Sequence, residues 1–169
     1  MLKAISDDAV LLDDARMAPL RRFVEWECRL LDDQRFEKWL ELYAPTATYW
    51  APAKHGQASP YDHVSLFWDD KETMQIRVER LLHPEIHSQI PASATMRMVN
   101  NFRAVAAGED FQVECRFLMV EDRLGSARLA FAGTLHYLLA AQGKNLQILH
   151  KRVDLTNCDH AFNALTQPF

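Results

Sequence analysis

Seven histidines are the first residues in this sequence that could do chemistry, and His83 and His87 lie four positions apart. On an unbroken helix this spacing would bring both imidazoles to one face, where they could bind zinc. The zinc-protease motif also needs a glutamate directly after the first histidine, but Pro84 stands there and favours the end of a helix. We therefore interpret His83 and His87 as loop residues and predict that this chain holds no metal.

Neither the other histidines nor the cysteines show the spacing of metal ligands. The remaining histidines are His55, His63, His136, His150 and His160. Histidines on predicted strands, such as His136 and His150, are more often hydrogen-bonded than metal-bound. Cys28, Cys115 and Cys158 are odd in number and far apart, and the sequence has no Cys-x-x-Cys pair. This pattern argues against a disulfide framework and against a zinc or iron–sulfur site on paired cysteines.

Composition excludes several other classes of function. The sequence has five glycines, with no Gly-x-Ser-x-Gly elbow, Gly-x-Gly-x-x-Gly turn or phosphate loop, so nucleophilic serine and nucleotide sites of these kinds are not expected. A net charge of -4 and basic residues that never run beyond pairs argue against nucleic-acid binding, which needs a basic face. No apolar run approaches the roughly 18 residues of a membrane span, and we expect a cytoplasmic protein.

Acid–base chemistry in an enclosed pocket is the alternative that the residues leave open. A carboxylate or imidazole held in an apolar cavity has a shifted pKa and can transfer protons. Asp33, Tyr49, His87 and His136 are the candidates for a base, a phenol donor and imidazole partners, as in a stand-alone isomerase or dehydratase. However, Asp33 is explained equally well as a helix cap, and Tyr49 as a core aromatic.

The first half of the chain has the periodicity of helices. We expect a first helix from Pro19 in its first turn, and Asp32-Asp33 should end it and cap the next. The second helix would carry an apolar stripe from Phe36 to Tyr43 and stop at Pro45. Short strands are expected over 46–50 and 64–68. Asp69-Asp70 should then cap a third helix, with Met74, Val78, Leu81 and Leu82 inward, that closes at His83-Pro84.

The second half changes to the alternation of strands. Four long strands are expected between residues 94 and 157, joined by turns near Gly108, Gly125 and Gly143, with Gly133 as a bend. Connections this short permit only antiparallel pairing. The whole chain, 1–169, should therefore form one α+β cone, with three helices in the concave face of a strongly curved antiparallel sheet. Its parts are an N-terminal extension (1–16), a helical half with two short strands (17–82), the long strands (94–157) and a tail (158–169).

A protein-binding surface is the third possibility. The segment around Trp68 and residues 87–95 mix apolar and polar side chains without periodicity, and Pro168-Phe169 could insert into a neighbouring molecule. Exposed aromatic residues commonly anchor interfaces, although Trp68 is equally compatible with a place in the core.

Several sequence blocks, taken in their order, resemble the β (small) subunit of aromatic-ring-hydroxylating dioxygenases. The blocks are Phe23-Val-Glu-Trp-Glu-Cys-Arg-Leu-Leu-Asp-Asp33, Phe36-Glu-Lys-Trp-Leu-Glu-Leu-Tyr43, Tyr49-Trp-Ala-Pro52, Val64-Ser-Leu-Phe-Trp-Asp-Asp70, Arg77-Val-Glu-Arg80, Pro91-Ala-Ser-Ala-Thr95, Asn101-Phe102, Gly133-Thr-Leu-His-Tyr137 and Ile148-Leu-His-Lys-Arg-Val-Asp-Leu-Thr-Asn157. They span about residues 20–157. This family lies within the cone-shaped superfamily of nuclear transport factor and steroid isomerase relatives. Phe102 departs from the β-branched residue that is usual in the family, and Phe67-Trp68 stands where Tyr-Tyr is common.

The resemblance implies a non-catalytic subunit that scaffolds an α subunit in an α3β3 hexamer and itself trimerises. The α subunit would carry the Rieske 2Fe-2S cluster and the mononuclear Fe(II), while a reductase delivers electrons from NADH. The complex would add O2 to an aromatic ring to give a cis-dihydrodiol. The Tyr49-Trp-Ala-Pro52 segment and the short N-terminus resemble members that act on single-ring carboxylates such as benzoate. The resemblance thus implies no catalytic, cofactor-binding or metal-binding residue in this chain.

Overall fold

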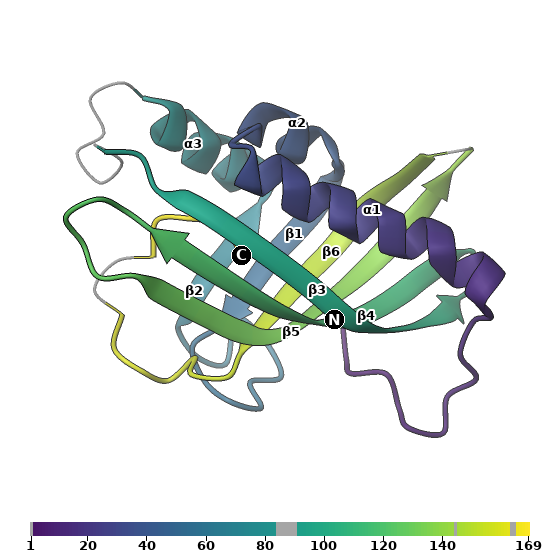
Figure 1. Ribbon diagram of the computed structural model, residues 1–169. Coiled ribbons are helices and arrows are strands. Elements are labelled where there is room, and N and C mark those ends of the chain that lie inside the picture. The colour runs from purple at the N-terminus through teal and green to yellow at the C-terminus, as the bar shows by residue number, and fades with distance from the viewer. Residues whose placement is uncertain (1, 84–90, 144, 163–164) are drawn as a thin grey trace.

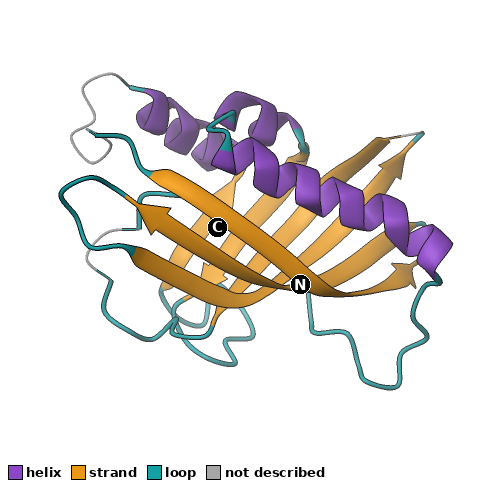
Figure 2. Ribbon diagram, in the orientation of Figure 1, coloured by secondary structure: helices purple, strands orange, loops and turns teal. Residues whose placement is uncertain are grey.

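The protein is built on one six-stranded sheet with helices against one of its faces. The computed structural model describes residues 2–83, 91–143, 145–162 and 165–169. The strands are β1 (Tyr43–Pro52), β2 (Ser65–Asp70), β3 (Ala94–Ala107), β4 (Asp110–Asp122), β5 (Leu129–Gln142) and β6 (Asn145–Leu155), in the order β2-β1-β6-β5-β4-β3. Helices α1 (Asp14–Asp32), α2 (Phe36–Glu41) and α3 (Lys71–Leu82) cover one face of the curved sheet (Figures 1 and 2). The predicted α+β cone is confirmed.

Pairing in the sheet is antiparallel except at one place. Strands β3, β4, β5 and β6 form successive antiparallel pairs, as their alternation and short turns predict. Strand β1 pairs antiparallel with β2 but parallel with β6, with Trp50 opposite Arg152. The prediction of a wholly antiparallel sheet was therefore wrong at this pair. Its premise was hairpin connections, whereas β1 and β6 are neighbours joined through the rest of the chain.

Helix α1 begins earlier than the sequence analysis predicted. Its N-cap is Asp13, whose carboxylate accepts a hydrogen bond from the Arg16 N–H at 2.9 Å, and Pro19 lies inside the helix. A carboxylate that accepts from a free N–H is a strong start signal, and Asp14 in the first turn adds a favourable interaction with the helix dipole. The helix ends at Asp32, as expected, with Asp33 as its C-cap.

Helix α2 is shorter than predicted, because the apolar stripe continues into a strand. It ends at Glu41, and Tyr43 already belongs to β1, which also contains Pro45. Its N-cap is Arg35, without a side-chain hydrogen bond, so neither Asp32 nor Asp33 caps it. Phe36 and Trp39 of α2 and Tyr43 of β1 are all buried in the same core. Their spacing in the sequence therefore matches that of one helical stripe, although they belong to a helix and a strand. The shift in β1–β6 register between Tyr43 and Thr48 spans Pro45, which has no N–H to donate.

Helix α3 follows the prediction closely. Asp70 caps it by accepting a hydrogen bond from the Thr73 N–H at 2.8 Å, and the helix ends at Leu82 with His83 as C-cap. Met74 and Val78 are buried, as expected, whereas Leu82 is exposed. Pro84 and His87 lie outside the described residues.

The sheet has an inner face, which carries the helices, and an outer face. The odd-numbered residues point inward in β4, in β5 and in the 151–155 part of β6. Among them, Val113, Cys115, Leu135, Tyr137 and Val153 are fully or almost fully buried. Their even-numbered neighbours form the outer face, on which cross-strand partners stand side by side, for example Glu114, His136 and Arg152. The inner face forms the hydrophobic core, and the outer face carries an ionic network around His136.

Gly133 is required by close packing between β5 and β6. A Cβ atom at this position would lie 2.1 Å from the backbone oxygen of Asp154. We predict that Gly133→Ala destabilises the chain by about 1–3 kcal/mol, the usual cost of overpacking, because two paired backbones would have to separate. Urea denaturation measures the effect, with Ala130→Ser, at an exposed position on the same strand, as the control. An unchanged midpoint for Gly133→Ala would contradict this description of the contact.

Candidate functional site

The interior of the cone is organised around a buried ion pair between Glu27 of α1 and Lys151 of β6. Both residues are essentially inaccessible to solvent, and the Lys151 Nζ donates to Glu27 Oε1 at 2.7 Å. The Glu27 carboxylate also accepts from the Trp39 indole at 2.9 Å and from the hydroxyls of Tyr43 and Tyr137 at 3.2 and 2.7 Å. Four donors thus compensate the desolvation of this carboxylate.

The C-terminal tail completes this cluster from the other side. Lys151 donates a second hydrogen bond to the Phe169 carbonyl at 2.6 Å, and the Phe169 N–H donates to the Tyr49 hydroxyl at 2.9 Å. The Phe169 ring is buried against Phe67, Phe117 and Phe131, with centroid distances of 5.2–6.4 Å. The idea that Pro168-Phe169 inserts into a neighbouring molecule was therefore wrong: Phe169 fills the cone of its own chain.

A second ionic contact links helix α1 to strand β3 and to the tail. Asp32 accepts from the Arg97 N–H at 2.8 Å and forms an ion pair with the Arg97 guanidinium. The same guanidinium donates to the Pro168 carbonyl. Arg97 therefore fixes the end of the tail that carries Phe169 into the core.

The nominated acid–base residues that the structure describes, Asp33, Tyr49 and His136, do not come together. Asp33 is exposed at the C-terminus of α1, next to Arg29. Tyr49 points into the filled core, where burial raises the pKa of its hydroxyl above the ordinary value. His136 lies on the outer face, on the opposite side of the sheet, and His87 falls outside the described residues. Tyr49 and His136 could not share one pocket in this fold.

His136 is held between two carboxylates on the outer face. Its Nε2 lies 3.1 Å from Asp154 and its Nδ1 lies 3.4 Å from Glu114. Burial, the largest influence on Asp154, would raise the pKa of its carboxyl, but hydrogen bonds and charges from His136 and Arg152 outweigh it and lower that pKa. The N-terminal segment covers this network, because the Ile5 N–H donates to Glu114 at 3.2 Å. These contacts are typical of a structural network rather than of an open site.

The cysteines are free and buried. Burial raises the pKa of the Cys28 thiol to about 12, and it raises the pKa of Cys115 further. At neutral pH these two thiols are protonated and poorly nucleophilic.

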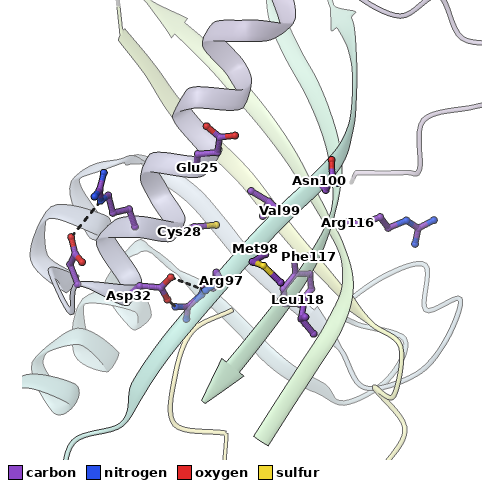
Figure 3. Close-up of a pocket in the computed structure, with 12 residues that line it drawn as sticks. Glu25, Cys28, Asp32, Arg97, Met98, Val99, Asn100, Arg116, Phe117 and Leu118 are labelled. Carbon is purple, nitrogen blue, oxygen red and sulfur yellow. Dashed lines mark hydrogen bonds and ion pairs between the residues drawn. The ribbon is translucent and has the colours of Figure 1, made fainter. Parts of the chain in front are cut away.

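A groove of about 800 Å³ runs between α1 and the edge of the sheet (Figure 3). Its walls are formed by residues from α1 and its C-cap, from β3 and from β4, namely Glu25, Cys28, Arg29, Asp32, Asp33, Arg97, Met98, Val99, Asn100, Arg116, Phe117 and Leu118. Asp32 and Arg97 are paired with each other across it (Figure 3). The groove bends around β3, which is an edge strand of the sheet, and so reaches the outer face at Met98 and Leu118.

An apolar strip on the outer face continues from this groove. Met96 and Met98 on β3 are 55% and 54% exposed, and Leu118, the β4 partner of Met98, is 37% exposed. Val120 and Ala132 extend the strip across β4 and β5. We call these five residues the methionine strip. Contiguous exposed apolar side chains, and methionine in particular, mark protein-binding surfaces.

Comparison with known proteins places this geometry in a family. The family model described as "Ring hydroxylating beta subunit" matches residues 26–159. The chain belongs to this family. The matched region contains both members of the buried pair, Glu27 and Lys151. The chain is thus related to subunits of oxidoreductase complexes, as its sequence blocks suggested.

Individual relatives agree with the family assignment. This β subunit is 33% identical over 129 residues to the small oxygenase component of the p-cumate 2,3-dioxygenase system of Pseudomonas putida, covering 75% of this chain and 71% of the relative. It is 28% identical over 154 residues to the benzoate 1,2-dioxygenase β subunit of Acinetobacter baylyi, covering 87% and 90%. A crystal structure of the benzoate 1,2-dioxygenase β subunit of Burkholderia mallei superposes with a TM-score of 0.71 at 23% identity, covering 88% and 94%, which supports the fold.

Sequence reasoning missed the two residues at the centre of this β subunit, although a signal was present. Glu27 continues the helical stripe of Leu20, Val24 and Leu31, and Lys151 has the same inward parity as Val153. Two opposite charges at inward positions of different elements predict a buried pair.

No helix among the described residues is long and apolar enough to cross a membrane.

Lys151→Met tests the buried pair. We predict a loss of about 3–5 kcal/mol in the free energy of unfolding, because Glu27 would be left as an uncompensated buried charge. The double variant Glu27→Gln/Lys151→Met should recover part of this loss. Arg128→Met provides the matched control, since its pair with Asp122 is exposed and should contribute less than about 1 kcal/mol. Equal effects of Lys151→Met and Arg128→Met in urea denaturation would contradict the central role of the pair.

Proposed function

We propose that this β subunit is a non-catalytic scaffold that assembles with a dioxygenase α subunit as an α3β3 complex, with the β chains forming a trimer. The α subunit would hold the Rieske cluster and the mononuclear iron, and a reductase would supply electrons from NADH in the cytoplasm. One observation carries the proposal. The interior of the cone is filled by the Glu27–Lys151 pair and Phe169, whereas the outer face leaves an apolar strip uncovered.

The methionine strip is the surface that we propose for subunit contact. Interface cores are depleted of charge and enriched in methionine and arginine, and Arg116 lies beside Met98 and Leu118 on the wall of the groove. The long β3 strand also lies at the sheet edge, and the N-terminal segment covers part of it, because the Leu12 N–H donates to the Ala104 oxygen at 2.9 Å. An edge strand that is left open invites unwanted pairing unless a partner covers it. The methionine strip is continuous with the β3 edge. This continuity favours one extended interface with a partner subunit.

We also propose that the complex acts on a single-ring aromatic carboxylate. Support comes from the two sequence relatives described above, whose names refer to aromatic carboxylates, p-cumate and benzoate. Substrate contacts would lie in the α subunit, so this part of the proposal concerns the complex and not the surface of this chain.

Coexpression with the large subunit of the same dioxygenase tests the assembly. We expect the two chains to co-purify, the β subunit alone to be colourless, and the complex to convert benzoate, but not naphthalene, to a cis-dihydrodiol. Met98→Glu and Leu118→Glu should weaken assembly at least about tenfold, because each places a charge in an apolar contact. Ile76→Glu, at an exposed site on α3, serves as the control.

The scaffold role and the proposed interface can fail separately. An α subunit that does not co-purify and is fully active alone would contradict the scaffold role. Normal assembly of both strip variants, measured by light scattering, would instead show that the interface lies elsewhere.

A further inference from the structure

Three potential metal ligands lie close together in the loops that follow the C-terminal ends of β1 and β6. Strands β1 and β6 are parallel neighbours, so their C-terminal ends, at Pro52 and Leu155, lie side by side. His55 follows the end of β1 by three residues, and Cys158 and Asp159 follow the end of β6 by three and four. The parallel pairing thus brings together side chains that are about a hundred positions apart in the sequence.

The distances between the potential ligand atoms of this group are close to those around a bound zinc ion. One ligand atom from each of His55, Cys158 and Asp159 can be chosen so that all three lie within 4.8 Å of one another. In a tetrahedral zinc site with bonds of about 2.0–2.3 Å, ligand atoms are about 3.3–3.8 Å apart. The side chains of His55 and Asp159 are each more than half exposed, so both can rotate by the small amount required, and His55 Nε2 already lies 3.5 Å from the Asp159 carboxylate.

The ligand types select the kind of ion. A thiol sulfur, an imidazole nitrogen and a single carboxylate suit a borderline ion such as Zn²⁺, whereas Ca²⁺ and Mg²⁺ prefer shells of oxygen ligands. Cys158 is buried, and Asp159 supplies the one carboxylate of the group. A Zn²⁺ ion bound there would displace the proton of the thiol, because a cysteine binds the metal as thiolate.

From this juxtaposition, we propose that His55, Cys158 and Asp159 form a Zn²⁺ site, completed by water. The ion would clip the loop between β1 and β2 to the turn after β6 and so close the end of the parallel β1–β6 pair. The prediction of a chain without metal came from spacing along the sequence, which does not reveal ligands brought together by a parallel pairing. The site is independent of the α subunit and of the proposed scaffold role.

Zn²⁺ titration of the purified, reduced, chelator-treated full chain tests the site by calorimetry. We expect about one equivalent to bind and the thermal midpoint to rise with added Zn²⁺. Co²⁺ used in its place should give a sulfur-to-cobalt charge-transfer band, because Cys158 would bind as thiolate. His55→Ala and Asp159→Asn should each weaken binding at least about tenfold, since even outer-shell changes commonly cost 10–100-fold.

The controls separate this site from adventitious binding. His63→Ala removes an exposed histidine from the same loop and should leave the titration unchanged. Cys158→Ser should abolish the charge-transfer band, and circular dichroism checks that this variant is folded. Either absence of Zn²⁺ binding by the wild-type chain or wild-type affinity in the exposed-site variants His55→Ala and Asp159→Asn would overturn the proposal.

Discussion

The buried contact between Glu27 and Lys151 is the constraint on which the rest of the structure depends. It joins the first helix to the last strand, so elements 124 residues apart must be in place before either charge is compensated. Its remaining hydrogen bonds come from α2, β1, β5 and the C-terminal tail, through Trp39, Tyr43, Tyr137 and Phe169. Separation of α1 from β6 would leave two buried charges unpaired, which costs several kcal/mol, and movement of the other elements would remove hydrogen bonds that compensate these charges.

This arrangement makes the interior of the cone a packed core. A cone can use its interior either for a ligand or for a packed core. Here the polar centre is consumed by internal hydrogen bonds, and Phe169 occupies the aromatic space between β2, β4 and β5. The surface left for interaction is therefore the outside, where the sheet carries an ionic network around His136 and the methionine strip beside it.

The sequence predicted what depends on local chemistry. Alternating apolar residues and glycine turns located β3 to β6, and Asp70 located the start of α3, because periodicity and capping act within a few residues. Helix α2 was extended too far, since Tyr43 continues a helical stripe from within a strand. The parallel β1–β6 pair, and with it the approach of His55 to Cys158, is set by tertiary packing that leaves no local pattern. Glu27 and Lys151 were readable from their inward positions, but charges are usually assumed to face solvent.

Hydrogen exchange at the tryptophan indoles tests most directly whether the cone interior is closed. The Trp39 indole N–H donates to Glu27 and is buried, whereas Trp26 and Trp68 are substantially exposed and provide internal references in the same spectrum. The packed-core account predicts that the Trp39 indole proton exchanges as slowly as the backbone amides of the central strands. Exchange of Trp39 at the rate of Trp26 and Trp68 would mean that water enters the cone freely, and would contradict the account.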